Sequence, residues 1–295
     1  MRKTKILILI NAFAPTLETR QTARFCEEFR ARGAEVEVKR NDFFPTAVEG
    51  GKATINIDCD ACLFLDKDKY VSQLMEKRGV RLFNSARAIA DCDDKMQTHM
   101  ILADSGIPMP DTLPGLLCYD KTAAVPPEVF DAVEKKLGYP VIVKQSYGSC
   151  GKGVFKADDR KALIDIVESI KTTSHLYQRY VARSHGKDMR VIVVGGKVLG
   201  GILRMSDVDF RSNIGLGGKA VKTDVPPEIR DIALRVTDIL GLDYCGIDFL
   251  LAENPLLCEV NSNAFFDAFE AATGINVAGA YAEHILKSIG KTARG

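Results

Sequence analysis

The chain has 295 residues, of which 46% are hydrophobic and 27% are charged. Such a composition is typical of a globular protein, and the length is enough for roughly two or three compact units. Forty basic residues nearly balance thirty-nine acidic ones, so the net charge of +1 gives no general attraction for nucleic acid or an anionic membrane. We therefore expect neither a nucleic-acid partner nor a membrane partner.

The first 94 residues predict a small parallel α/β layer. Apolar runs predict strands, and the amphipathic stretches between them predict helices closed by glycines. The expected strands are residues 5–10, 35–39, 61–65 and 80–83, and the expected helices are residues 17–32 and 68–78. The first apolar run is too short for a signal peptide or a membrane span. The turn after it, NAFAPT, lacks the glycines of a dinucleotide-binding turn, which argues against a Rossmann cofactor site.

Eight cysteines are scattered along the chain without the spacing of a secreted disulfide scaffold. We therefore expect a reducing, cytoplasmic location. The closest pair, Cys59 and Cys62, has no second pair beside it, so a zinc site is not expected there. The four histidines form no metalloprotease motif.

Beyond residue 91 the chain predicts further units. A capped helix is expected from Asp91, ended by Gly106, which places a domain boundary near residue 94. The segments PVIVK and HLYQRYV predict strands on either side of a helix near residues 159–171.

The following segment contains hairpin and helix signals. Gly195-Gly196 lies between two apolar runs, which predicts a β-hairpin. A helix should then start at a cap, Thr223 or Asp224, and stop at Gly241.

Residues 246–261, GIDFLLAENPLLCEVN, predict a hairpin with acidic side chains on one face. With residues 252–255 as the loop, the apolar pairs would be Leu251–Leu256, Phe249–Cys258 and Ile247–Val260. The same register places Asp248 opposite Glu259, with Asn261 on the same side. Facing carboxylates repel, so a positive group is expected between them, and oxygen ligands suit Mg²⁺ or Mn²⁺. An edge hairpin with solvated charges is the alternative.

A second motif predicts a phosphate-binding loop. Lys144 ends the apolar strand VIVK and precedes QSYGSCGKGV, where glycines free the backbone and serines add hydroxyl groups. The residues concerned are Ser146, Gly148, Ser149, Gly151 and Gly153. Lys152 is followed by Gly153, so this is not a loop of the GKS or GKT type. A flexible surface loop is the alternative.

The order of these motifs resembles the ATP-grasp superfamily, and within it the RimK-like branch of the ribosomal-protein S6 glutamate ligase. The motifs are Lys95, Lys144 with its glycine loop, QRYV, GKDMR, DFRSN, Asp248 and EVN, between about Lys95 and Gly290. The resemblance implies an α/β protein, α+β in its ATP-grasp part. An N-terminal parallel α/β domain (residues 1–94) would precede a two-subdomain ATP-grasp domain (95–290), divided into a lid (95–176) and a C-terminal metal-binding part (177–290).

The resemblance also implies a nucleotide site with ATP as co-substrate. Lys95 and Lys144 would hold the phosphates, with residues 146–153 as a lid loop. Gln178, Tyr180 and Val181 would line the adenine pocket, largely through main chain, and Asp188 would reach the ribose or its neighbourhood. The implied ATP-binding residues are Lys95, Lys144, Ser146, Gly148, Ser149, Gly151, Gly153, Gln178, Tyr180, Val181 and Asp188. Arg179 is a departure, since relatives often carry an acidic residue there.

The remaining implied site residues handle charge. Arg190, Arg204 and Arg211, which we expect at strand ends, would clamp phosphate or a carboxylate substrate, and Asn213 would face the reacting phosphates. Asp248, Glu259 and Asn261 match the family's ligands for Mg²⁺ or Mn²⁺, in agreement with the hairpin register. The segment SNAFFDAFE departs from the family pattern, so Phe265 and Phe266 should alter the wall of the substrate site.

The activity implied by the resemblance is ADP-forming ligation of a carboxylate to an amine through an acyl phosphate. The expected partners are ATP, an amino acid such as glutamate, and a carboxylate on a metabolite, peptide or carrier protein. Whether the protein forms a homo-oligomer is left open by the sequence. A dipeptide ligase of the D-alanine type is a first alternative, disfavoured by DFRSN and GKDMRV. A nucleotide-binding regulator without catalysis is the second, disfavoured because the charged site residues are retained.

Overall fold

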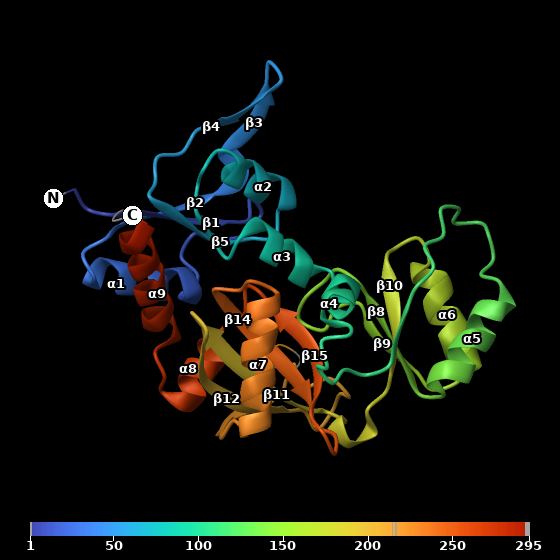
Figure 1. The fold of residues 1–295 in the computed structure, drawn as a ribbon. Helices are drawn as coiled ribbons and strands as arrows, with labels where there is room; N and C mark the ends of the chain where they lie inside the picture. Colours follow the sequence, from blue (N-terminus) through green and yellow to red (C-terminus); the bar gives the residue numbers. More distant parts are fainter. Residues whose placement is uncertain (1, 214, 216, 293–295) are drawn as a thin grey trace.

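The computed structural model describes residues 2–213, 215 and 217–292, which form three regions (Figure 1). The N-terminal region contains a parallel sheet of order β2-β1-β5-β6. Its strands are β1 (Lys5–Ile10), β2 (Glu35–Arg40), β5 (Ala61–Leu65) and β6 (Leu82–Phe83). The sequence prediction of a parallel layer is confirmed, with β6 shorter than expected.

Both faces of this sheet are buried because its central strands are continuously apolar. Ile6, Ile8 and Ile10 pack with α1 (Arg20–Ala31) and α9 (Val277–Thr292), whereas Leu7 and Leu9 pack toward α2 (Lys69–Lys77). Helix α9 therefore returns from the end of the chain to close the N-terminal layer beside α1 (Figure 1). No helix among the described residues has the length and apolar character needed to cross a membrane.

The sequence analysis missed a two-stranded hairpin that projects from this region (Figure 1). It consists of β3 (Thr46–Glu49) and β4 (Lys52–Ile55) and follows the short 3₁₀ helix η1 (Asn41–Phe43). Gly50 and Gly51 form its turn with φ of 55° and 76°. The Gly-Gly pair between short runs was the signal that could have revealed it.

The lid is an antiparallel sheet of order β7-β10-β8-β9. Its strands are β7 (Thr112–Pro114), β8 (Val141–Gln145), β9 (Val154–Ala157) and β10 (His175–Arg179), and α5 (Pro127–Leu137) and α6 (Arg160–Ile170) pack on it. The predicted limit between residues 176 and 177 falls inside β10, which pairs with β7 through Gln178 and with β8 through Arg179. The limit of the lid therefore moves to residue 180, just before the 3₁₀ helix η2 (Ala182–Ser184).

The C-terminal region is a five-stranded antiparallel sheet of order β13-β12-β11-β14-β15. Its strands are β11 (Lys187–Val194), β12 (Lys197–Met205), β13 (Lys219–Thr223), β14 (Tyr244–Leu250) and β15 (Leu256–Asn261). Helices α3 (Ala86–Asp93), α4 (Lys95–Leu102) and α7 (Pro227–Ile239) share one apolar cluster with this sheet, and α8 (Asp267–Thr273) contacts β12 and β13. Helix α4 thus packs on β15 and α7, although the predicted lid included it.

Two local predictions about this sheet have different outcomes. The Gly195-Gly196 turn is confirmed, with φ of 52° and 70° between β11 and β12. The predicted helix start at Thr223 or Asp224 is wrong, because Thr223 pairs with β12 and α7 begins only at Pro227.

The predicted cap of the helix after residue 91 also differs. Asp94, rather than Asp91, caps α4 by accepting from the backbone N–H groups of Met96 and Gln97.

The register of the β14–β15 hairpin is confirmed where the acidic residues lie. Asp248 is opposite Glu259, and Ile247 is opposite Val260. The predicted pairing of Phe249 with Cys258 is wrong, because a bulge follows Asp248 and Phe249 is opposite Leu257. The loop spans residues 251–255 rather than 252–255, and the bulge absorbs the extra residue, so the acidic pair keeps its register.

Candidate active site

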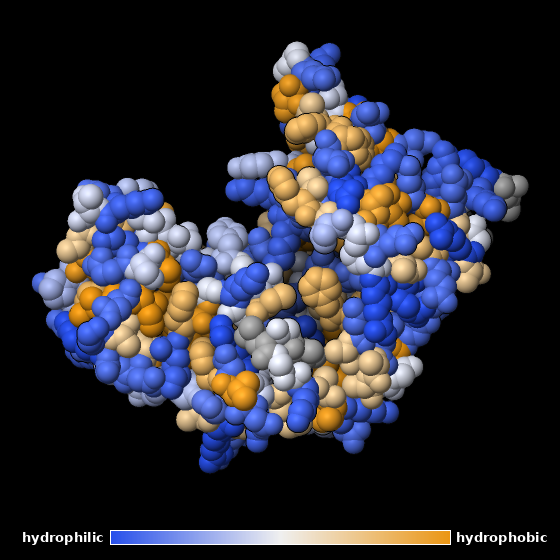
Figure 2. Space-filling model, turned by 180° about the vertical axis from the view of Figure 1, so that it is seen from behind, coloured by the Kyte–Doolittle hydropathy of each residue, from blue (hydrophilic) through white to orange (hydrophobic). Residues whose placement is uncertain are grey.

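The candidate site is a cleft between the lid and the five-stranded sheet. Figure 2 shows the surface hollowed between the lid, on the left of that view, and the N-terminal region. The cleft brings together most of the predicted residues: Lys95, Lys144, Gly148, Ser149, Gly151, Gln178, Tyr180, Val181, Asp188, Arg204, Arg211, Asn213, Asp248 and Glu259. Ser146, Gly153, Arg190 and Asn261 lie outside this lining.

Two of these outlying residues shape the glycine loop. The backbone of Ser146 bonds Ser174 and the first residue of α4, Lys95, and its side chain is buried. Gly153 has a φ of 73°, and a Cβ there would lie 2.4 Å from the side chain of Gln145. Both residues therefore support the loop rather than line the cleft, and direct contact with ATP stays a prediction for each.

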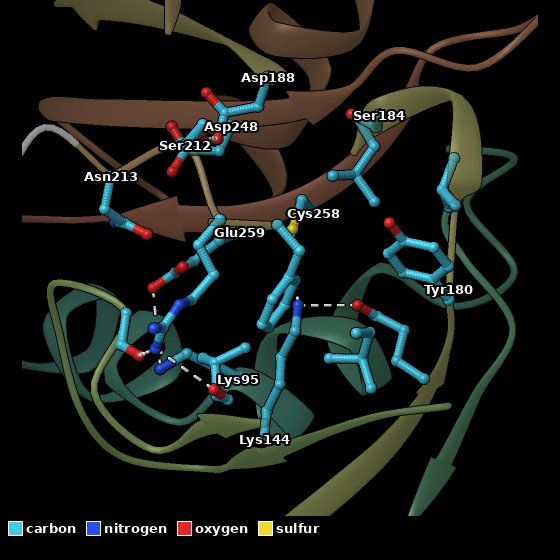
Figure 3. A pocket seen from close by; sticks show the side chains of 18 of the residues that line it. Lys95, Lys144, Tyr180, Ser184, Asp188, Ser212, Asn213, Asp248, Cys258 and Glu259 are labelled. Atoms are coloured by element: carbon cyan, nitrogen blue, oxygen red, sulfur yellow. Dashed lines mark hydrogen bonds and ion pairs between the residues drawn. The ribbon is translucent and has the colours of Figure 1, made fainter. Parts of the chain in front are cut away.

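Lys144 points into the cleft from the lid and is almost completely buried (Figure 3). Its ammonium nitrogen donates to Oε1 of Gln178 at 2.7 Å and lies 3.5 Å from the sulfur of Cys258. The predicted strand-end position is nearly correct, since β8 extends one residue further to Gln145. A fixed ammonium beside a glycine loop is suited to phosphate oxygens.

The glycine loop is held over the cleft by two other cations. Lys95 Nζ donates to the carbonyl oxygen of Gly148 at 2.9 Å, and Arg211 Nη1 donates to that of Gly151 at 2.7 Å. Lys95 also lies 3.7 Å from Glu259. Two groups predicted to bind phosphate thus donate to loop carbonyl oxygens, and a bound phosphate would have to replace these contacts or add to them.

A buried chain of alternating charges crosses the floor of the cleft. Both nitrogens of one edge of Arg190 donate to the two oxygens of Asp248 at 2.7 Å. Arg204 bonds both oxygens of Asp188, at 2.7 and 2.5 Å, and also lies 2.9 Å from Asp248. Ser212 donates a further hydrogen bond to Asp188. The ribose contact of Asp188 therefore stays a prediction, because its oxygens already have partners.

Charge and burial oppose one another at these carboxylates. Burial alone would raise the pKa of Asp248, but the guanidinium groups of Arg190 and Arg204 hold that pKa below its usual value. At Asp188 burial dominates and raises the pKa despite Arg204. Each of the two facing carboxylates already has a positive group beside it. Arg190 and Arg204 lie beside Asp248, and Lys95 lies beside Glu259. The like-charge argument therefore does not by itself require a metal ion.

The arginines also differ from their predicted strand-end positions. Arg190 lies in the interior of β11, which begins at Lys187. Arg204 is close to the end of β12 as expected, whereas Arg211 lies in the loop after it. Their roles as substrate clamps stay predictions.

The predicted metal ligands retain a chemistry suited to a hard cation. Glu259 and Asn261 are alternate residues of β15, so they share one face, and Asp248 is opposite Glu259. The side-chain nitrogen of Asn261 is buried without a hydrogen-bond partner. No three His, Cys, Asp or Glu side chains cluster as a metal site within the described residues. Two carboxylates and an amide oxygen are ligand types that suit a hard cation, but both oxygens of Asp248 accept from Arg190, so an ion there would have to share or replace these contacts.

The cleft lining includes the three residues that we expect to form an adenine pocket, Gln178, Tyr180 and Val181. Gln178 is buried, and the hydroxyl of Tyr180 lies 2.5 Å from Nδ1 of His185. Arg179 bonds Asp111 and the last carbonyl groups of α5, so its side chain connects parts of the lid, and the residue also belongs to the lining of the cleft.

Only one of the two predicted wall phenylalanines is available to a substrate. Phe265 is 62% exposed, but Phe266 is buried and its ring lies 5.3 Å from that of Phe25. The expectation that Phe266 forms part of the substrate wall is therefore wrong.

Several lining residues were not anticipated. Cys258, predicted to be in the core, is displaced by the bulge into the cleft beside Lys144. No sequence signal marks this bulge. Ser212 lay next to the predicted Asn213 in the quoted element and could have been chosen with it.

The sequence comparison identifies the family. A family model for the RimK-like ATP-grasp domain matches residues 92–285, which is well over half of the chain. The chain belongs to the RimK-like ATP-grasp family. N-acetylaspartylglutamate synthase A of Homo sapiens is 41% identical over 227 residues, covering 75% of this chain and 56% of that protein. Beta-citrylglutamate synthase B of Danio rerio is 40% identical over 225 residues, with coverages of 75% and 54%. The chain thus spans a little over half the length of these relatives.

A solved structure confirms the fold expected for a RimK-like chain. D-alanine–D-alanine ligase from Bacillus anthracis superposes with a TM-score of 0.73, covering 99% of both chains at 18% identity. The mixed α/β fold with an ATP-grasp part is therefore confirmed. At this identity the similarity concerns the fold alone.

Proposed function

We propose that this RimK-like chain is an ATP-dependent, ADP-forming ligase that joins glutamate to a carboxylate of a small metabolite. The observation that carries the proposal is the single cleft in which Lys95, Lys144 and the glycine loop face Asp248 and Glu259 (Figure 3). The names of the two relatives both describe products that contain glutamate, which supports glutamate as the amine donor. We also propose a cytoplasmic location, supported by eight free cysteines.

The proposed reaction has two steps. A substrate carboxylate attacks the γ-phosphoryl group of ATP, which gives an acyl phosphate and ADP. The amino group of glutamate then attacks the acyl carbon, loses a proton and expels phosphate, so that an amide bond forms. No side-chain nucleophile is required, and catalysis depends on positioning and on neutralising charge.

The chain's own residues would divide these tasks. Lys95 would exchange its present partners for phosphate oxygens, and Lys144, which has three donors, would add phosphate oxygens to its contact with Gln178. Arg190 uses one edge of its guanidinium group for Asp248, so its remaining N–H groups are the donors we assign to the substrate carboxylate or acyl phosphate. Asp248, Glu259 and Asn261 would hold Mg²⁺, which we favour over Mn²⁺ because it retains several non-protein ligands. When bound, the ion would neutralise phosphate charge.

Product analysis tests the proposal. The protein is incubated with ATP, Mg²⁺, glutamate and a panel of carboxylates that includes N-acetylaspartate and citrate, and mass spectrometry detects any glutamyl amide. ADP and phosphate are the expected by-products, and hydroxylamine in place of glutamate should give a hydroxamate. AMP and pyrophosphate would contradict the acyl-phosphate route. Lys144→Met provides the inactive control.

A dipeptide ligase of the D-alanine type is the second candidate from the sequence analysis, where the segments DFRSN and GKDMRV disfavour it. Adding D-alanine alone as both substrates tests this candidate, since D-alanyl-D-alanine should then accumulate. Nucleotide binding without any turnover on either panel would instead point to a regulator.

A further inference from the structure

A buried histidine connects three parts of the nucleotide site. His99 lies on α4, four residues after Lys95, and is 7% exposed. Its Nε2 lies 3.3 Å from Nε2 of Gln178, on the lid strand β10. The ring also hydrogen-bonds the backbone of Cys258, the bulge residue of β15. One imidazole therefore contacts the lid strand and the metal-binding strand from the helix that carries Lys95.

The donors and acceptors in the series of hydrogen bonds from Lys144 through Gln178 to His99 are fixed by chemistry. An ammonium group has donors only, so Lys144 requires the oxygen of the Gln178 amide, and the 2.7 Å contact is made to Oε1. The amide nitrogen must then donate on its other side, where it meets Thr112 Oγ1 at 3.0 Å and His99. His99 must accept at Nε2, which leaves its proton on Nδ1 to donate to the Cys258 carbonyl group.

The surroundings of His99 keep it in this neutral form. Burial is the main effect, and the positive charge of Lys144 adds to it, so the pKa of His99 falls to about 4. A second proton would turn Nε2 into a donor facing the amide N–H groups of Gln178. It would also place two positive charges near one another in a buried site.

We propose that His99 is a positioning residue that orients the amide of Gln178 and, through it, aims the ammonium group of Lys144 at the phosphates of ATP. This inference rests on the proposed function, because it assigns Lys144 to nucleotide phosphate. Without an acceptor at His99, the nitrogen of the Gln178 amide keeps only Thr112 as a partner, so the amide that holds Lys144 is oriented less firmly. Lys144 then loses its pre-oriented partner, and nucleotide binding must supply the ordering.

Substitutions that imitate one ring nitrogen at a time test the proposal. In His99→Gln the side-chain oxygen can reach the position of Nε2 and still accept from Gln178. In His99→Asn the shorter side chain reaches only the position of Nδ1 and cannot accept there. We expect Asn to weaken binding of ATP with Mg²⁺ roughly three- to tenfold and Gln to stay within about twofold of wild type, as for loss of one net hydrogen bond.

Isothermal calorimetry with ATP and Mg²⁺ is the readout, so the result does not depend on ligase turnover. Failure to form any product would contradict the proposed function, whereas the comparison of ATP affinities between the His99 variants would stay valid. Equal ATP affinities for the Gln and Asn variants would overturn the positioning role. His175→Asn is the matched control: His175 is also buried and lies on β10, but its ring bonds Thr173 and Tyr177 in place of Gln178. It should change thermal stability without changing ATP affinity.

A double-mutant cycle distinguishes positioning from simple packing. In a Gln178→Met background the amide is gone, so His99→Asn should cause no further loss of ATP affinity. A full additional loss in that background would show that His99 acts by another route and would overturn the proposal. If His99→Asn proves too unstable to purify, the Gln variant still decides the matter. It must retain ATP affinity in the wild-type background, and a tenfold loss there would be contrary to the proposal.

Discussion

The two carboxylates that face each other across the β14–β15 hairpin should respond differently to neutralisation. If only the repulsion between the two facing charges mattered, neutralising either carboxylate would leave the free energy of unfolding unchanged or raise it slightly. The surroundings of Asp248 reverse that expectation. Asp248 is 4% exposed, receives two hydrogen bonds of 2.7 Å from Arg190 and lies 2.9 Å from Arg204.

Asp248→Asn leaves two guanidinium groups beside one neutral amide in a buried site. Removing one partner of a buried ion pair costs about 3 to 5 kcal/mol, because the remaining charge is uncompensated. The amide oxygen of Asn can still accept one hydrogen bond, so we expect the lower end, about 3 kcal/mol. At roughly 2 to 4 °C per kcal/mol for a chain of this size, the melting temperature should fall by about 6 to 12 °C.

Glu259→Gln is the matched comparison. The side chain of Glu259 is 28% exposed, and its ion-pair partner Lys95 is 3.7 Å away. A partly solvated pair at this distance contributes about 0 to 1 kcal/mol, so the melting temperature should change by no more than a few degrees. Both variants should lose metal-dependent turnover.

The assay is thermal and urea unfolding followed by circular dichroism, with EDTA and without nucleotide, so that no bound metal contributes. An Asp248→Asn protein as stable as wild type would refute the reasoning, because it would show that Arg190 and Arg204 do not depend on this carboxylate. Equal large losses for both variants would also contradict it.

The remaining predictions concern the lid, the arginine clamp and acid stability. Lys144→Met should weaken ATP binding at least tenfold in calorimetry, because it removes a buried ammonium group. Proteolysis within residues 146–153 should slow when ATP and Mg²⁺ are added, as measured by limited digestion; an unchanged rate would count against a lid. Arg190→Lys should reduce turnover more than ATP affinity in steady-state kinetics, because lysine keeps the charge but loses the two-pronged contact with Asp248. Acid stability should depend on Glu28. Burial by itself would raise the pKa of Glu28, but hydrogen bonds from Asn276, Arg32 and Arg24 keep that pKa below its ordinary value of 4.5. This carboxylate therefore stabilises the fold above that value and loses its contribution as pH falls through the lowered pKa, and Glu28→Gln should flatten the acid limb of unfolding curves.

The sequence by itself determined the features that depend on neighbouring residues. Continuous apolar runs predicted β1 and β5 as buried parallel strands, and Gly195-Gly196 predicted the β11–β12 turn. The order of the charged motifs predicted the family, and the hairpin pattern placed Asp248 opposite Glu259. These signals are local because side-chain periodicity and turn geometry are set within a few residues.

Only the tertiary structure decided which charges meet. Arg190 and Asp248 are 58 positions apart, and they pair because β11 lies beside β14 in the sheet. That order leaves no trace in local periodicity, so the arginines looked like free substrate clamps and Asp248 like an unpaired metal ligand. The bulge at Cys258 was equally hidden, because one extra residue in a strand is accommodated by packing around it and not by a turn signal. Long-range pairing in the folded chain therefore determines how strongly each predicted site residue is already engaged before a substrate arrives.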